Sequence, residues 1–251
     1  MMVFGDYAHY YDAFYTSKNY EQECDFLEAI FRRHSLRPVK TVLDLGCGTG
    51  SHMMALLQRG FQVSGVDASV PMLGVAKQKL LRAGFKSSLH KSSLQKFALD
   101  QKFDAVICMF SVIDYLTRDQ DIKSMLARVR EHLKPGGLFI CDFWQASAVT
   151  GFTPLKRKVF RQADVTVERY SRTKHKKRQR LCEVHYSCLI KNKGKLIQRI
   201  KEEHCMRYFN VDEMKTFLEQ AGLTVVMTSP FLKLDGRIRS NTWDVSLIAR
   251  R

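Results

Sequence analysis

The stretch TVLDLGCGTGSH, residues 41–52, constrains the fold more than any other part of the chain. An apolar segment runs into Gly46, Gly48 and Gly50, and a helical pattern follows. Glycines at these positions allow a tight turn and a close approach of the main chain to a ligand. The pattern therefore predicts a β-strand, a ligand-binding turn and a helix, which together are typical of a parallel α/β sheet.

Short apolar runs alternate with segments of helical spacing as far as Trp144. Ser69 is placed to cap a helix that has Pro71 in its first turn, and residues 134–137, KPGG, are placed to end another before a strand. The alternation predicts a parallel sheet covered by helices on both faces. The strand candidates are residues 41–45, 61–67, 103–110 and 136–144, and the helix candidates are residues 52–60, 70–84 and 120–134.

The pattern changes after Phe143. Long, approximately alternating segments predict antiparallel strands, and KNKG at 191–194 is suited to a hairpin turn between the last two. Asn210 and Glu213 then predict a capped helix that ends at Gly222. The alternating segments are residues 159–173, 181–190 and 195–209, and two closing strands are expected at 224–231 and 242–250.

These patterns together predict an α/β fold. We expect a Rossmann-like, doubly wound sheet of about seven strands with helices on both faces, plus an antiparallel β insertion after the fifth strand. We find no linker or internal repeat, so a single domain over residues 1–251 is the simplest organisation. In this domain an N-terminal helical cap is expected at about 1–36 and the insertion at about 155–209.

The glycine turn does not match the two common phosphate-binding loops. A dinucleotide-binding turn, G-x-G-x-x-G, requires glycine at position 51, where the chain has Ser51. A P-loop requires a lysine that is absent from this turn. Asp44 would repel a pyrophosphate but suits an ammonium group, and Asp67, one βα unit further on, suits a ribose. S-adenosylmethionine combines both groups without a phosphate, whereas the alternative is ordinary βα loops with a capping aspartate.

The chain resembles the class I S-adenosylmethionine-dependent methyltransferases. The resemblance rests on VLDLGCGTG at 42–50, on VSGVDAS with the following PML, and on LKPGGLFI at 133–140. Within this family the chain is similar to the group that includes N-methyltransferases of nucleotide-linked amino sugars. That similarity lies in YYDAFYTSKNYEQECDFL, GTGSH, FDAVICMFSVIDYL and the insertion ending in RYF.

The resemblance implies a role for particular residues. Asp44 and the turn would hold the methionine end of S-adenosylmethionine, Asp67 the ribose, and Ala68 and Met72 the adenine. Tyr11 and Tyr20 would close over the site, although core packing is an alternative for Tyr11. Relatives commonly place an acidic residue where this chain has Ser93, so adenine recognition would rely more on Leu94. The full set of implied cofactor contacts is Tyr11, Tyr20, Asp44, Gly46, Cys47, Gly48, Gly50, His52, Asp67, Ala68, Met72, Ser93, Leu94 and Met109.

Asp114 and Tyr115, just after the fourth predicted strand, are the candidates for orienting the methyl acceptor. A helix N-cap and a packed aromatic ring are their structural alternatives. Some amino-sugar enzymes have a histidine where this chain has Tyr115. Trp144 could form a flat wall for a sugar or base, and Arg237 and Arg239 are candidates for contacting a phosphate.

The second part of the chain is strongly basic. Residues 146–251 carry 23 of the 41 Lys and Arg side chains but 10 of the 25 Asp and Glu side chains. This charge suits phosphates, nucleic acid or an anionic surface, or it is simply a solvated surface. The run RTKHKKRQR at 172–180 likewise either binds an anionic partner or is a solvated, charged segment. Seven dispersed cysteines with no CxxC pair predict reduced, buried thiols and no metal site.

A small, phosphate-bearing acceptor such as a nucleotide-linked amino sugar or a glycan precursor is therefore the leading hypothesis for the substrate. An RNA or protein methyltransferase is the second, and a non-catalytic cofactor-binding subunit the third. Nucleic acid as a partner is not favoured, because no RRM or KH motif is present. The absence of a long apolar run or signal-like segment predicts a cytoplasmic protein without membrane insertion. Formation of a homodimer is left open.

Overall fold

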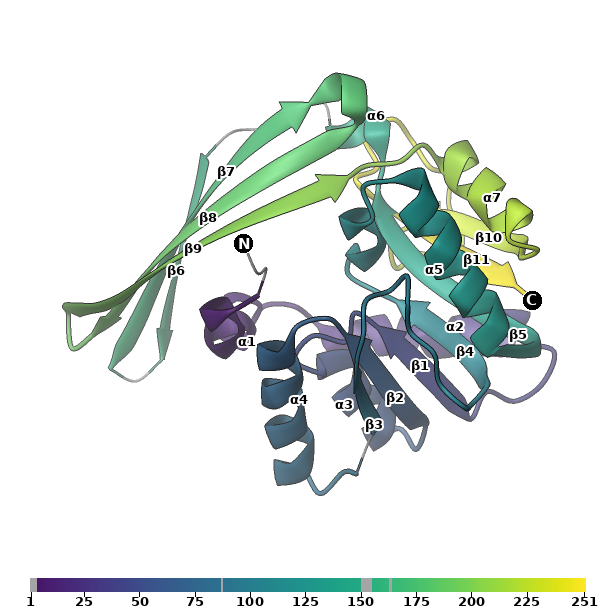
Figure 1. Cartoon of the computed structure of the whole chain (residues 1–251), viewed down its shortest axis with the longest axis horizontal. Helices are drawn as coiled ribbons and strands as arrows, with labels where there is room; N and C mark the ends of the chain where they lie inside the picture. Colours follow the sequence, from purple (N-terminus) through teal and green to yellow (C-terminus); the bar gives the residue numbers. More distant parts are fainter. Residues whose placement is uncertain (1–3, 87, 150–154, 163) are drawn as a thin grey trace.

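The computed structural model describes residues 4–86, 88–149, 155–162 and 164–251 (Figure 1). A seven-stranded sheet has the strand order β10-β11-β5-β4-β1-β2-β3. β11 is antiparallel to both neighbours, and the other pairs are parallel. The predicted Rossmann-like sheet is thereby confirmed. Its strands are β1 (Thr41–Leu45), β2 (Gln62–Asp67), β3 (Ser88–Lys91), β4 (Phe103–Cys108), β5 (Leu133–Trp144), β10 (Thr224–Pro230) and β11 (Asp244–Arg250).

The central strands are apolar because both of their faces are covered. Along β1, Val42 packs into one buried cluster and Leu43 into the other. The cluster that contains Leu43 lies against α5 and α7, and the cluster that contains Val42 lies against α2 and α3. With α4, these helices have the following bounds: α2 (Tyr20–His34), α3 (Ser51–Gln58), α4 (Val70–Arg82), α5 (Asp119–His132) and α7 (Val211–Gln220).

The predicted helix caps are confirmed. The Ser69 side chain accepts a hydrogen bond from the Met72 N–H at 3.3 Å at the start of α4. Asn210 and Glu213 form a capping box at the start of α7. The helix before the fifth strand ends at His132, two residues before the expected Lys134, and β5 begins at Leu133, three residues before the expected Gly136. Gly136 and Gly137 lie in the strand as expected and exchange backbone hydrogen bonds with Arg251.

The antiparallel insertion is a four-stranded sheet in the order β6-β7-β8-β9. The segment 159–173, expected as one strand, is divided between two strands of a hairpin. KNKG forms the predicted β8–β9 turn, with Lys193 and Gly194 both at positive φ, as a two-residue hairpin loop requires. The strands are β6 (Leu155–Gln162), β7 (Val165–Lys176), β8 (Leu181–Asn192) and β9 (Lys195–Arg207), with the short helix η3 (Lys177–Gln179) between β7 and β8.

The N-terminal helices lie between this second sheet and α4 (Figure 1). Tyr7 and Phe14 form a buried cluster with Cys188, Ile190 and Ile200 of the second sheet. Residues 1–3 of the expected cap lie outside the described residues. The remaining short elements are η1 (Asp6–Tyr10), α1 (Tyr11–Phe14), η2 (Val112–Tyr115) and α6 (Ala146–Val149).

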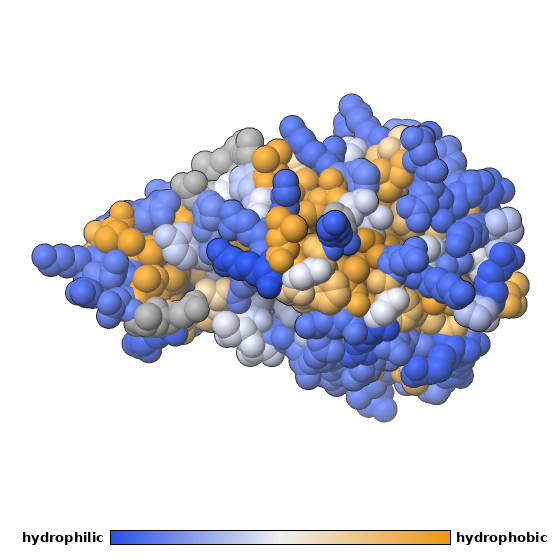
Figure 2. All heavy atoms as spheres, turned by 90° about the horizontal axis from the view of Figure 1, so that it is seen from below, coloured by the Kyte–Doolittle hydropathy of each residue, from blue (hydrophilic) through white to orange (hydrophobic). Residues whose placement is uncertain are grey.

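The surface is mixed in polarity. Figure 2 shows hydrophilic residues over much of one face, with hydrophobic residues gathered near its middle and towards the end formed by the second sheet. Leu196 and Ile197, at the start of β9, are exposed. Across the described ranges, no helix combines the length and apolar character needed to cross a bilayer. All seven cysteines are free thiols, and only Cys205 is not fully buried.

Candidate active site

A cavity of about 410 Å³ opens at the carboxyl ends of β1, β2 and β4, the edge at which ligands bind in open α/β sheets. The N-terminal helices cover it on one side, and the second sheet contributes Tyr186, His204 and Met206. Most of the residues expected at a cofactor or acceptor site line this cavity: Tyr11, Tyr20, Gly46, Cys47, Gly48, His52, Asp67, Ala68, Met72, Leu94, Met109, Tyr115 and Trp144.

The glycine turn is held in an unusual backbone conformation. Gly46 and Gly48 have φ angles of 70° and 54°, which favour glycine. A Cβ atom on Gly46 would lie 2.4 Å from Cγ1 of Val112, so this glycine also permits close packing. Gly50, at the start of α3, packs against Ala76 and is not among the cavity-lining residues. The turn thus exposes Gly46, Cys47 and Gly48 to the cavity.

Asp67, at the end of β2, is held by the turn. Its carboxylate accepts hydrogen bonds from the N–H groups of Gly48 at 2.9 Å and Ser69 at 2.7 Å. Burial raises the pKa of this carboxyl, and the backbone hydrogen bonds oppose that rise. A carboxylate has about four acceptor positions, so both oxygens keep capacity for ligand hydroxyl groups.

Asp44, at the end of β1, does not line the cavity surface but lies behind the turn. Its side chain is buried, and within the described part of the chain its Oδ2 atom has no hydrogen-bond partner. Burial raises the pKa of Asp44 to about 6. A buried carboxylate with an unused acceptor is unfavourable unless a ligand cation comes near. This site therefore fits the ammonium group of S-adenosylmethionine.

The expected adenine contacts are only partly brought together. Ala68, Met72 and Leu94 line the cavity. Ser93 does not, and its carbonyl accepts hydrogen bonds from the N–H groups of Lys96 and Phe97. Leu94 thus lies at the cavity where Ser93 does not, and its part in adenine recognition stays a prediction.

Ion pairs and hydrogen bonds tie the N-terminal helices to the turn, to α4 and to the second sheet. Asp12 accepts a hydrogen bond from the Thr49 hydroxyl at 2.6 Å and pairs with Lys79 of α4 at 2.7 Å. Arg169 of β7 donates to the hydroxyls of Tyr7 at 2.9 Å and Tyr15 at 3.4 Å. These contacts order the aromatic side chains that cover the cavity.

The two acceptor-orienting candidates occupy different places. Tyr115 lines the cavity, and its hydroxyl lies 2.7 Å from Nδ1 of His204. Asp114 is fully buried outside the lining, where its Oδ2 accepts a hydrogen bond from the Trp144 N–H at 3.1 Å. Burial raises the pKa of Asp114 well above its usual range. Its geometry supports the wall of the cavity instead of presenting a carboxylate to the acceptor.

Sequence reasoning did not single out His204, Tyr186 or Met206. They come from the insertion, and their side chains reach the cavity because alternate residues of a strand share a face. The alternation of 195–209 could have placed His204 and Met206 together, but it does not reveal that their face meets Tyr115.

The basic residues lie away from the cavity. Arg237 and Arg239 are exposed on the segment between β10 and β11 and are not cavity-lining. The Arg239 carbonyl accepts a weak hydrogen bond from Gln145, next to Trp144. The basic run 172–180 forms the end of β7 as far as Lys176 and then the short helix η3. Among the described residues, no Lys or Arg lines the cavity.

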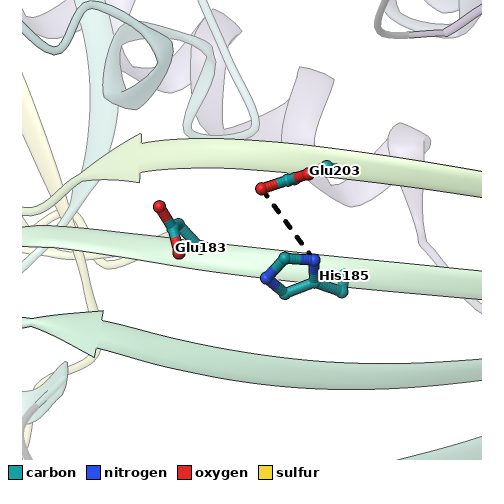
Figure 3. A group of neighbouring side chains, drawn as sticks. All are labelled: Glu183, His185 and Glu203. Atoms are coloured by element: carbon teal, nitrogen blue, oxygen red, sulfur yellow. Dashed lines mark ion pairs between the residues drawn. The ribbon is translucent and has the colours of Figure 1, made fainter. Parts of the chain in front are cut away.

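A group of possible metal ligands lies on the other face of the second sheet. Glu183, His185 and Glu203 have ligand atoms within 4.8 Å of one another (Figure 3). The His185 Nδ1 atom is 4.0 Å from Glu203 Oε1, and Glu183 is paired with Lys176. The lysine already neutralises Glu183, so this group resembles an ordinary charged surface.

Comparison with known proteins agrees with this geometry. A model of the Methyltransferase domain family matches residues 42–137. A dTDP-3-amino-3,6-dideoxy-alpha-D-glucopyranose N,N-dimethyltransferase of Streptomyces fradiae is 30% identical over 225 residues, covering 88% of this chain and 85% of that protein. A dTDP-3-amino-3,4,6-trideoxy-alpha-D-glucopyranose N,N-dimethyltransferase of Streptomyces venezuelae is 28% identical, covering 88% and 91%.

The fold is also found in solved structures. An S-adenosylmethionine-dependent methyltransferase from Clostridium acetobutylicum superposes with a TM-score of 0.84 at 22% identity, over 98% of this chain and 97% of that chain. With the cavity, the glycine turn and the two aspartates, these similarities establish that the chain belongs to the S-adenosylmethionine-dependent methyltransferases and is an enzyme that uses S-adenosylmethionine as its cofactor.

Proposed function

We propose that this enzyme methylates an amino group of a small acceptor, and that a nucleotide-linked amino sugar is the leading acceptor class. The observation that carries the proposal is the aromatic end of the cavity, where Tyr115 and His204 face a space walled by Trp144 and Tyr186. The similarity to the two amino-sugar dimethyltransferases over most of both chains supports the same acceptor class.

The cofactor supplies a methyl group on a positively charged sulfur. In the proposed arrangement Asp67 accepts the ribose hydroxyls, and Ala68, Met72 and Leu94 border the adenine. The turn from Gly46 to Gly48 contacts the methionine end, and Asp44 balances its ammonium group from behind the turn. Positioning the acceptor in line with the methyl–sulfur bond supplies much of the acceleration, because the leaving group is already activated.

The proposed acceptor enters between Trp144 and Tyr115 with its sugar ring inside the cavity. A phosphate on the acceptor would remain near the exposed segment that carries Arg237 and Arg239, since no Lys or Arg of the described residues lines the cavity. Because Tyr186, His204 and Met206 of the insertion line the cavity that the main sheet forms, we also propose that the chain works as one domain.

The decisive experiment is a methyl-transfer screen over nucleotide-linked amino sugars, free amino sugars, simple amines and RNA, with product mass locating the methyl group. We expect transfer to the sugar amino group. Transfer to RNA, together with co-purifying RNA that dissociates steeply with salt, would favour a macromolecular substrate instead. Cofactor binding without transfer to any of these acceptors would contradict the proposed acceptor class.

The role of Asp67 is tested by calorimetry with S-adenosylmethionine. Loss of hydrogen bonds to a charged acceptor, worth roughly 1.5–3 kcal/mol, predicts at least tenfold weaker binding to Asp67→Ala. The exposed Asp100→Ala serves as the matched control. Equal affinities for the wild type and Asp67→Ala would refute the ribose assignment.

A further inference from the structure

A chain of three side chains leads away from the acceptor end of the cavity. The Tyr115 hydroxyl is 2.7 Å from Nδ1 of His204. Nε2 of His204 lies at an ion-pair distance of 3.5 Å from Oε2 of Glu202 and makes no hydrogen bond within the described part of the chain. His204 and Glu202 are buried, with 2% and 6% of their surfaces exposed. Both point to the cavity face of β9, because residues two apart on a strand share a face.

The surroundings determine which nitrogen of His204 carries the proton. Glu202 accepts hydrogen bonds from the backbone N–H groups of Phe4 at 2.7 Å and Gly5 at 3.1 Å. Its carboxylate therefore acts as an acceptor, and a nitrogen that faces it is better protonated. With the proton on Nε2, Nδ1 is free to accept the Tyr115 hydroxyl proton. The phenolic oxygen then turns its lone pairs towards the cavity.

The other groups packed on the His204 ring are mainly aromatic. Rings of Tyr186 and Phe4 lie 5.0 Å from it, and the ring of Tyr7 lies at 6.3 Å. On the second sheet, Arg169 lies over the ring of Tyr186 and donates a hydrogen bond to the Tyr7 hydroxyl. Glu202 is therefore the charged group placed to stabilise a positive imidazole ring.

Tyr115 is poorly suited to hold negative charge itself. Burial raises its pKa well above the usual range, and its neighbours include Tyr186 and Glu202, which raise it further. A phenolate is therefore an unfavourable intermediate. For Tyr115 to take up a proton from the acceptor, its own hydroxyl proton must leave in the same step. Nδ1 of His204, at 2.7 Å, is the acceptor in place for it.

We propose that Tyr115, His204 and Glu202 form a proton relay that neutralises the acceptor's ammonium group before methyl transfer. One proton passes from the ammonium nitrogen to the Tyr115 oxygen as the Tyr115 hydroxyl proton passes to His204 Nδ1, leaving an imidazolium beside Glu202. The neutral nitrogen then forms its bond to the methyl carbon while the methyl–sulfur bond breaks, and that electron pair stays on sulfur. This relay rests on the proposed amine acceptor.

The relay is tested by comparing single-turnover rates of the wild type and His204→Asn at pH 7 and at about pH 10, with a nucleotide-linked amino sugar. We expect His204→Asn to be about 100-fold slower at pH 7, as for loss of a general base. The ratio should fall towards one at the higher pH, where the amine is already neutral in solution. A purely structural role would lower the rate by the same factor at both pH values and would overturn the relay.

Two further variants make the comparison specific. Tyr115→Phe should show the same pH-dependent loss, with unchanged affinity for S-adenosylmethionine. His185→Asn, the same substitution on the outer face of the second sheet (Figure 3), should keep the wild-type rate within twofold. A rate for His204→Asn that matches His185→Asn at pH 7 would overturn the proposal.

A second readout does not depend on turnover. In protein labelled with ¹⁵N-histidine, the signal absent from His204→Asn identifies this residue. We expect its Nε2 to be protonated and its Nδ1 to be unprotonated, with the Nδ1 shift altered in Tyr115→Phe. A proton on Nδ1 would overturn the relay. Failure of the wild type to methylate any amino sugar would instead contradict the proposed function, and the NMR result would still decide the proton arrangement.

Discussion

Glu23 and His52 form a buried hydrogen bond of 2.7 Å between Oε2 and Nε2, which joins the N-terminal helix α2 to the helix that follows the glycine turn. Lys18 pairs with the same carboxylate, and the ring of Tyr20 packs edge-on against His52, with centroids 4.9 Å apart. Because Tyr20 and His52 both line the cavity, the contact connects the cap with the cofactor turn.

Glu23→Gln should lower the free energy of unfolding at pH 7 by about 1–3 kcal/mol, since His52 and Lys18 lose a charged partner. Burial raises the pKa of Glu23, but the hydrogen bonds and charges of His52 and Lys18 outweigh it and leave the pKa below its usual range. The stabilisation is therefore present above the ordinary glutamate pKa and is lost as the pH falls through the lowered one. Urea unfolding at several pH values measures this difference, with the exposed Glu21→Gln as control. A pH-independent difference would contradict the assignment.

Asp44→Asn should stabilise the unliganded enzyme and weaken cofactor binding. Burial raises the pKa of Asp44 to about 6. Ionisation of this carboxyl therefore lowers the free energy of unfolding as the pH rises from about 4 to 6, and the loss persists at higher pH. Removing this carboxylate should raise the free energy of unfolding at pH 7.5 by about 1–3 kcal/mol. Denaturant unfolding and calorimetry, with Asp100→Asn as control, measure the two effects. Lower stability in the variant would show that the carboxylate is satisfied without a ligand.

Gly46→Ala should be more harmful than a glycine replacement with similar backbone geometry elsewhere. Gly60 also has a positive φ, 87°, but a Cβ there meets nothing within 4 Å. Gly60→Ala should therefore cost about 1–2 kcal/mol of backbone strain, whereas Gly46→Ala should cost about 1–3 kcal/mol more, because its Cβ overlaps Val112. Thermal unfolding compares the two. Adding Val112→Ala should recover part of the loss, and equal losses would show that Val112 moves aside freely.

Local signals were sufficient to predict most of the fold. Alternation of buried strands with helices, the Ser69 cap and the Asn210–Glu213 capping box each depend on neighbours within a few residues, so the sequence displays them directly. The β6–β7 hairpin was missed for the same reason. Its connection around Asp164 lacks the glycine of the β8–β9 turn, and continuous alternation through it resembled one strand.

The site divides along a similar line. The cofactor end is built from the glycine turn and Asp67. Asp67 follows Gly48 by only 19 residues, so the turn and the aspartate are recognisable together as one motif. The acceptor end joins Tyr115 to His204, 89 residues away, through the packing of the insertion on η2. A tertiary contact of this kind leaves no spacing pattern, so the sequence could name Tyr115 but not its partner.

The remaining test concerns the segment that carries Arg239. If a nucleotide-linked acceptor places its phosphates near Trp144, Arg239→Gln should raise KM for that acceptor about fivefold, since a single exposed charge contributes about 1 kcal/mol. The value of kcat should stay the same, and KM for a free amino sugar should not change. The effect should shrink in 1 M salt, where screening is short-ranged. Arg178→Gln, which removes an exposed charge from the β7–β8 connection, is the control. If both variants raise KM equally, the general basicity of the second half attracts the acceptor, and the segment between β10 and β11 has no specific part in binding it.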